Sequence, residues 1–188
     1  MESQARVEPA NQVIFDNTID GLFRALRPFV TPTGKAKIRA LGLDMDGKLN
    51  PAYPAHVWAS AVKIFAADAY PGLAPFEGQR RVAERTVDAF AEGVIGTAMF
   101  TLLRLVGPDR TIGRMTRNLR TGSNYVETKA TQLEPHKYEI WINDVTDLPG
   151  FYLGLLERGL HLVGAKELKI ELANQTGPSC TYRVGWKG

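Results

Sequence analysis

Cysteine and histidine are scarce in this sequence, which holds one cysteine, Cys180, and three histidines, His56, His136 and His161, in 188 residues. A single cysteine excludes a disulfide within the chain and a cysteine-rich metal site in a monomer. No two histidines stand at the i, i+4 spacing that lets one helix hold a metal ion. We therefore expect no metal site.

Long apolar runs are missing as well. The most apolar stretch, Val94 to Val106, is interrupted by glycine, threonine and Arg104, and it falls short of the roughly 20 apolar residues that cross a bilayer. The N-terminal MESQARVEPANQ has no apolar stretch of the kind found in a secretory signal. These absences predict a cytoplasmic protein that does not span a membrane.

Complete catalytic motifs are absent too. The sequence contains no Gly-x-x-x-x-Gly-Lys-Ser/Thr loop and no Gly-x-Gly-x-x-Gly loop after a strand, which are the common nucleotide-binding motifs. It also lacks the Gly-x-Ser-x-Gly motif of serine hydrolases. The segment LDMDGKL, from Leu43 to Leu49, resembles the nucleophile loop of haloacid-dehalogenase-type phosphatases, in which Asp44 would attack phosphorus and Asp46 would handle the leaving-group proton beside Mg²⁺. No later acidic pair and no repeated strand–helix alternation completes such a site. We interpret the segment as a turn and keep a phosphatase using Asp44 and Asp46 as the less favoured alternative.

The patterns that are present predict one α+β domain over residues 13–188, after a flexible N-terminus over 1–12. Residues 13–122 are mainly helical, with apolar positions at helical spacing from Pro54 to Tyr70 and in one long helix from Pro75 to the break at Gly107-Pro108. Residues 123–188 form the sheet part. Period-two alternation there predicts strands over 124–133 and 138–143, a helix over 151–163 and two further strands, a four-stranded antiparallel sheet in ββαββ order.

An arginine ridge is the best functional candidate in the sequence. Asp109 is expected to cap a short helix on which Arg110, Arg114 and Arg117 share one face. Guanidinium groups bind carboxylate and phosphate through forked hydrogen bonds, and a polar turn after the helix could complete an anion site. The predicted ligand- or anion-binding residues are Arg110, Arg114, Arg117, Arg120, Ser123, Asn124 and Tyr125. The alternative is a solvated face whose arginines pair with acids and pack on the sheet.

Aromatic residues are spread over the helices and do not alternate with basic residues. This distribution favours an apolar core or cavity over the stacking of nucleic-acid bases. The small net charge of +3 also makes a nucleic-acid partner unlikely. The expected pocket-lining residues are Trp58, Phe65, Phe90, Met99 and Phe100.

Three segments carry a resemblance to a known family: YPGL at 70–73, LVGP at 105–108 and RMTRNLRTGSNY at 114–125. Together they resemble a paralogous family of unknown function that is abundant in myxobacteria, and the similarity runs from about Phe15 to Trp186. The C-terminal pattern of a strand, a helix and two strands, the last around Cys180, is also similar to the four-vinyl-reductase and heme-nitric-oxide-binding domain group. That resemblance implies a ligand cavity between helices and sheet.

The heme-binding members of that group supply a histidine from a helix and a Tyr-x-Ser-x-Arg triplet for the propionates. In this chain the corresponding strand reads YEIWI, from Tyr138 to Ile142, and residues 86–120 contain no histidine. We therefore consider a histidine-ligated heme improbable and predict no cofactor.

The function predicted from the sequence is a non-enzymatic, sensor-like domain. It would bind a small molecule in the apolar pocket and use the arginine helix for an anionic group or partner. A homodimeric protein-interaction module is the alternative.

Overall fold

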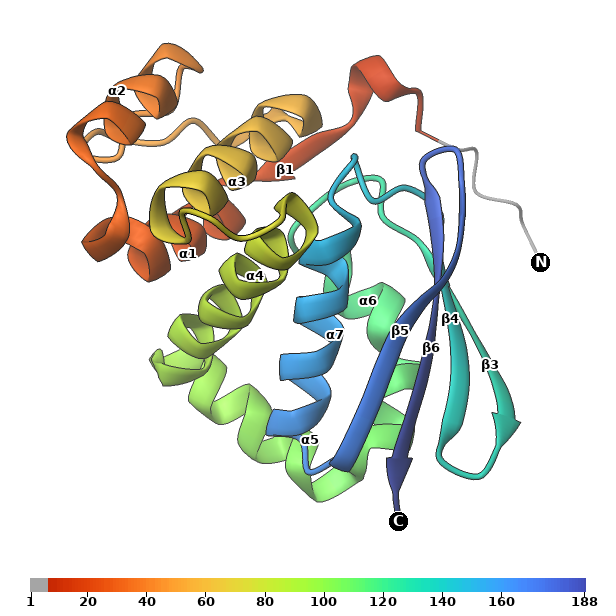
Figure 1. Cartoon of the computed structure of the whole chain (residues 1–188). Coiled ribbons are helices and arrows are strands. Elements are labelled where there is room, and N and C mark those ends of the chain that lie inside the picture. Colours follow the sequence, from red (N-terminus) through yellow and green to blue (C-terminus); the bar gives the residue numbers. More distant parts are fainter. Residues whose placement is uncertain (1–6) are drawn as a thin grey trace.

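Helices cover one face of an antiparallel sheet in the computed structural model, which describes residues 7–188 except the side chains of Ile95, Thr116 and Asn118 (Figure 1). The helices are α1 (Asp16–Leu26), α2 (Pro32–Ala40), α3 (Ala55–Ala69), α4 (Pro75–Glu92), α5 (Val94–Gly113), α6 (Met115–Leu119) and α7 (Pro149–Leu162). The strands are β1 (Val13–Phe15), β2 (Ala52–Pro54), β3 (Thr128–Glu134), β4 (Lys137–Ile142), β5 (Lys166–Thr176) and β6 (Ser179–Lys187). The predicted α+β class is confirmed.

The four-stranded sheet has the order β3-β4-β6-β5, with each neighbouring pair antiparallel. Since α7 joins β4 to β5, the predicted ββαββ order is also confirmed. The period-two alternation has the expected effect, because Ile140 on β4 and its partner Tyr182 on β6 are both fully buried on the helical side. Burying one such side chain stabilises the fold by about 1.5–3 kcal/mol.

Helix α7 lies between the sheet and α4 (Figure 1), and glycines let it approach α4 closely. A β-carbon added at Gly150 would lie 2.1 Å from the Phe76 carbonyl oxygen, and one at Gly154 would lie 2.4 Å from the Arg80 carbonyl oxygen. Arg80 also binds Glu157 on α7, with Nε 2.7 Å from Oε2. The seam between α4 and α7 is therefore held by backbone contact and by charge.

The long helix predicted from Pro75 to Gly107 is in fact two helices. The axes of α4 and α5 differ by 99°, and the backbone of Gly93 between them is extended. The bend packs the chain so tightly that a β-carbon at Gly96 would lie 1.8 Å from the Phe90 carbonyl oxygen. The break predicted at Gly107 is real, because its φ of 79° lies in the left-handed region that favours glycine.

The N-terminal helices α1 to α3 build their own part of the core on the far side of α4 (Figure 1). Strand β1 pairs with β2 there in antiparallel register, with Ile14 opposite Tyr53. The predicted flexible N-terminus includes residues 1–6, which lie outside the described residues. Gln12, the last residue of that predicted segment, is buried, and its Nε2 donates a hydrogen bond to Asp144 Oδ2 at 3.0 Å.

No single helix of the described residues is long and apolar enough to cross a membrane. Only the pair Pro75–Glu92 and Gly96–Gly113, taken together across its bend, reaches the length and composition required.

Candidate ligand cavity and arginine ridge

A small apolar cavity lies where α5, α6 and α7 meet. Its volume is about 100 Å³, and apart from the hydroxyl of Thr111 its side chains are apolar. The lining residues are Met99, Phe100 and Leu103 of the first half of α5, Thr111 of its second half, Met115 and Leu119 of α6, and Leu155, Leu156, Gly159 and Leu160 of α7. The site is a place for an apolar group, since few of its atoms can form hydrogen bonds.

The backbone at Gly107 sets how the two halves of α5, together with α6, surround this cavity. Its left-handed conformation ends the first half of α5 and redirects the chain, so that the second half and α6 return towards α7. Met115 and Leu119 are four residues apart on α6 and face the cavity together. Gly159 leaves open space on α7, because no atom lies within 4 Å of where its β-carbon would be.

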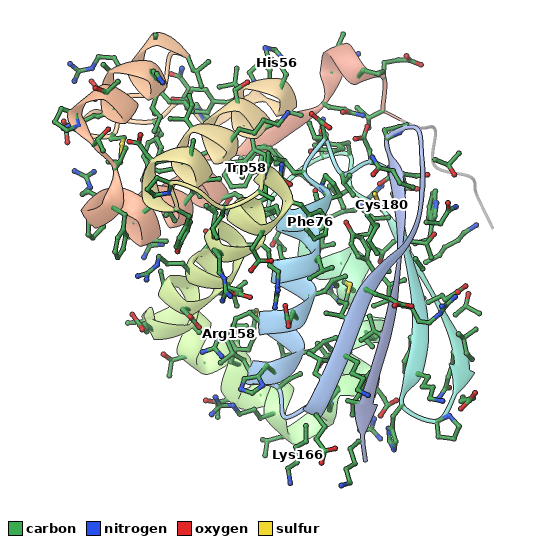
Figure 2. The ribbon with its side chains drawn as sticks, in the orientation of Figure 1. His56, Trp58, Phe76, Arg158, Lys166 and Cys180 are labelled. Carbon is green, nitrogen blue, oxygen red and sulfur yellow. The ribbon has the colours of Figure 1, made fainter. Side chains whose placement is uncertain are left out.

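Two of the five predicted pocket residues, Met99 and Phe100, line this cavity. Phe90 lies beside it, with its ring centroid 6.4 Å from that of Phe100, and it is partly exposed. Trp58 and Phe65 are buried in the N-terminal core (Figure 2 labels Trp58). The rings of Trp58 and Phe151 are nearly perpendicular, with their centroids 5.5 Å apart. The sequence did not indicate the α7 wall, although Gly159 among leucines was a signal of local space.

The first three arginines of the predicted ridge are exposed. Arg110 lies in the second half of α5, Arg114 caps that helix and Arg117 lies on α6. None of the three forms an ion pair with any described residue, in contrast to most arginines of the chain. Met115 and Leu119, which line the cavity, are close in sequence to Arg114 and Arg117.

Three of the remaining predicted ligand residues have partners within the fold. Arg120 binds Glu127, with Nη2 2.6 Å from Oε1. The Asn124 side chain binds the backbone of β1, because its Oδ1 accepts a hydrogen bond from the Val13 N–H at 2.9 Å. The Tyr125 hydroxyl lies 2.6 Å from Thr146 Oγ1, and burial raises the pKa of Tyr125.

Ser123 is different, because its hydroxyl is buried and has no hydrogen-bond partner among the described residues. Arg110, Arg114 and Arg117 are thus exposed, whereas Ser123 and Tyr125 of the polar turn are buried. Anion binding by these residues stays a prediction.

A second polar cluster, not predicted from the sequence, ties the hairpin β3–β4 to α5. The Asp109 carboxylate accepts from the Tyr138 hydroxyl at 2.6 Å, and its other oxygen lies 3.2 Å from His136 Nδ1. Burial, and after it the hydrogen bond to Asp109, raises the pKa of Tyr138 to about 12. Trp186 stacks on Tyr138 with ring centroids 5.6 Å apart. Asp109 therefore binds the hairpin.

The aspartates of the phosphatase-like segment form an exposed turn. Asp44 Oδ1 accepts from the Asp46 N–H at 3.0 Å, and this bond, followed by that from Arg39, lowers the pKa of Asp44. Asp46 pairs with Arg27 at 2.9 Å and with Lys35 at 2.5 Å, and the Lys35 hydrogen bond is the main cause that lowers its pKa. These cations already neutralise both carboxylates, which gives no support to a phosphatase.

The described residues contain no group of three or more histidine, cysteine or carboxylate side chains that could hold a metal ion. His56 lies at the outer end of α3 (Figure 2), and its side chain is exposed.

Comparison with known proteins gives one family and one fold. The family described as "Protein of unknown function (DUF2378)" matches residues 12–187. No curated protein matches the chain. The oxygen-complex structure of an "oxygen binding H-NOX domain related to soluble guanylate cyclases" is 13% identical, with a TM-score of 0.68 over 92% of this chain and 94% of that one. A mutant H-NOX of T. Tengcongensis is 14% identical, with a TM-score of 0.67 over 91% and 97%.

A third similar structure is described as "Modulating Heme Redox Potential Through Protein-Induced Porphyrin Distortion", with 13% identity and a TM-score of 0.69 over 92% of this chain and 94% of that one. These likenesses confirm the predicted similarity to the heme-nitric-oxide-binding fold group. The prediction of no cofactor, with a histidine-ligated heme considered improbable, was wrong. It relied on single side chains, whereas solved structures that share the fold over nearly their whole length include heme proteins.

Proposed function

The chain belongs to the family described as Protein of unknown function (DUF2378), and from its H-NOX-like fold and its apolar cavity we propose that it is a small-molecule-sensing domain without catalytic activity of its own. The ligand would enter between α5, α6 and α7. The cavity carries the proposal, because its wall combines apolar surface with two methionines, Met99 and Met115, whose flexible thioethers adapt to different shapes.

The size of the cavity implies that ligand binding moves the protein. Sites for ligands of drug-like size measure roughly 300–1,000 Å³, and this cavity measures about 100 Å³. The wall formed by α5 is the one that can move, because its first half lies between the extended backbone of Gly93 and the left-handed Gly107. A displacement of this helix is the signal that we propose.

The arginine ridge supports an amphipathic ligand. Arg114 directly precedes Met115, and Arg117 lies between Met115 and Leu119 in the sequence of α6; neither arginine forms an ion pair with a described acid. A ligand with an apolar body and a carboxylate or phosphate end could place its body against Met115 and its anionic end against these guanidinium groups.

Heme is the first ligand to test, because H-NOX domains share the fold. Proteins hold heme iron through histidine, cysteine, methionine or tyrosine, and the cavity wall offers Met99 and Met115. Arg114 and Arg117 suit the propionate groups. The residues therefore fit heme in their chemistry, provided that α5 moves outward. Bound heme would supply a redox-active iron centre.

The test is native mass spectrometry and an absorption spectrum of the undenatured protein, followed by titration with hemin. In the Gly159→Leu variant a side chain fills the open space of the cavity, and we expect the affinity for hemin or for a copurified ligand to fall at least tenfold. Gly159→Ala is the matched control, and it should bind like the original protein. Met99→Leu should shift the absorption of bound heme, whereas Met45→Leu, a buried methionine outside the cavity, should not.

Two results would overturn the proposal. One is a protein that copurifies with nothing and binds no hemin. The other is equal binding by the Gly159→Leu and Gly159→Ala variants, which would place any ligand outside this cavity.

A further inference from the structure

The outer face of α5 is an apolar helix surface that no described residue covers. Val94, Leu102 and Leu105 have exposed fractions of 91%, 64% and 80%. With the exposed Ala98 they follow one another at steps of four, four and three residues, so they form one stripe along the helix. We call these four residues the α5 stripe. An exposed apolar patch of this kind on a folded protein is typical of an interaction site.

The hydroxyl groups beside the α5 stripe can be buried at little cost. Thr97 Oγ1 donates to the Ala91 carbonyl at 2.9 Å, and Thr101 Oγ1 donates to the Thr97 carbonyl at 2.7 Å. Arg104 Nε donates to the Leu162 carbonyl at 2.7 Å, which holds its guanidinium against the protein. The hydroxyl donors of Thr97 and Thr101 already have acceptors within the chain, so a partner that covers them leaves neither unpaired. The remaining N–H groups of Arg104 have no acceptor among the described residues and must stay in contact with water at the edge of the covered face.

The sequence of the stripe is complementary to itself in one orientation. If two α5 helices pack antiparallel about a point near residue 100, Leu102 of one copy meets the small Ala98 of the partner subunit, and Leu105 meets Val94 of the partner subunit. Large residues then lie against smaller ones, which is how packed helices interdigitate. A surface that contacts its own copy about a two-fold axis is the usual basis of a homodimer.

Charge favours the same orientation. Glu92 lies exposed just before the stripe and Arg110 lies exposed just after it. Antiparallel packing directs these unlike charges towards each other, whereas parallel packing brings like charges together. The face between Val94 and Leu105 carries only one cation, Arg104, so it offers little to an anionic membrane surface.

From these observations we propose that the outer face of the first half of α5 is the contact between two copies of this chain, packed antiparallel. The inner face of the same helix carries Met99, Phe100 and Leu103 to the cavity. If the sensing function proposed above holds, a ligand that displaces α5 changes the dimer contact directly. The dimer itself does not depend on that function.

The first experiment is light scattering coupled to size-exclusion chromatography, on protein without added ligand. We expect a dimer for the unchanged protein and a monomer for the double variant Leu102→Glu/Leu105→Glu. The control is Leu133→Glu, since Leu133 on β3 is also an exposed leucine, at 48%, but does not belong to the α5 stripe, and this variant should stay dimeric. A monomeric unchanged protein, or a dimeric double variant, would refute the proposal.

Disulfide trapping tests the orientation without weakening the contact. In a Cys180→Ala background, a mixture of Val94→Cys and Leu105→Cys proteins should crosslink on oxidation, and Val94→Cys alone should not. The reason is distance: the two positions are 11 residues apart, about 16 Å along a helix, whereas a disulfide spans about 7 Å between α-carbons at most. Crosslinking of Val94→Cys alone would mean parallel packing and would contradict the proposal.

The other occupants of this face give distinct outcomes. If the protein is a monomer that sediments with vesicles of anionic phospholipid and loses this property in the Leu102→Glu/Leu105→Glu variant, the face is a membrane surface and the dimer proposal is wrong. Because none of these readouts uses a ligand, a failure of the sensing function would leave their result unchanged.

Discussion

At the scale of single residues, the glycines of α7 have opposite roles on one helix. Gly150 faces α4, where a β-carbon would lie 2.1 Å from the backbone oxygen of Phe76, and Gly159 faces open space. We expect Gly150→Ala to lower the free energy of unfolding by about 1–3 kcal/mol, because the two backbones must separate. Gly159→Ala should raise it by about 0.5–1 kcal/mol, since alanine loses less chain entropy in a helix. Urea unfolding of both variants checks this, and an equal effect of the two would contradict the assigned contacts.

At the scale of one element, α6 with its flanking residues joins an apolar face to a cationic one. Met115 and Leu119 face the cavity, whereas Arg114 and Arg117 are exposed and lack acidic partners in the described chain. If this is the anion site, the double variant Arg114→Gln/Arg117→Gln should weaken the binding of an anionic ligand at least fivefold and leave the melting temperature unchanged.

The control for this variant is Arg24→Gln/Arg39→Gln, which removes the same charge from α1 and α2. Isothermal titration calorimetry with hemin, or with the ligand found by mass spectrometry, measures the ligand affinity of both double variants. Equal affinities of the two double variants would mean that the arginines of α6 act only as a solvated face.

At the scale of the whole molecule, buried tyrosines make the fold sensitive to alkali. Burial raises the pKa of Tyr125, Tyr138, Tyr152 and Tyr182, and that of Tyr138 reaches about 12. A phenol with a raised pKa keeps its proton in the folded state after the unfolded chain, with a pKa near 10, has lost it. The stability from Tyr138 is therefore complete below about pH 10 and is lost as the pH rises towards about 12.

Chemical unfolding at a series of pH values tests this dependence. We expect the free energy of unfolding to fall steadily above about pH 10. The slope should be smaller for Tyr138→Phe, whereas Tyr70→Phe, which removes a half-buried tyrosine at the end of α3, should keep it. An unchanged slope in Tyr138→Phe would mean that this hydroxyl is in contact with water in the folded protein.

Elements with local signals could be predicted from the sequence alone. Alternation at Tyr138, Ile140 and Ile142 predicted a strand with one buried face, and Gly107 before Pro108 predicted the break in α5, because backbone conformation and the period of side chains depend on neighbouring residues. The spacing of Arg110, Arg114 and Arg117 predicted one helix face, but the structure divides these residues between α5, its C-terminal cap and α6.

Features that depend on contacts between distant residues became visible only in the folded chain. The bend between α4 and α5 could not be predicted, since apolar residues continue through it and Gly96 is required only by the Phe90 carbonyl packed against it. The cavity has walls from three helices, so the role of Gly159 as a lining residue could be recognised only once the fold had brought α7 next to Met99 of α5. Asn124 bonds Val13, 111 residues away, which no local pattern encodes. The sequence thus fixes short-range geometry, and long-range packing selects which of its side chains meet.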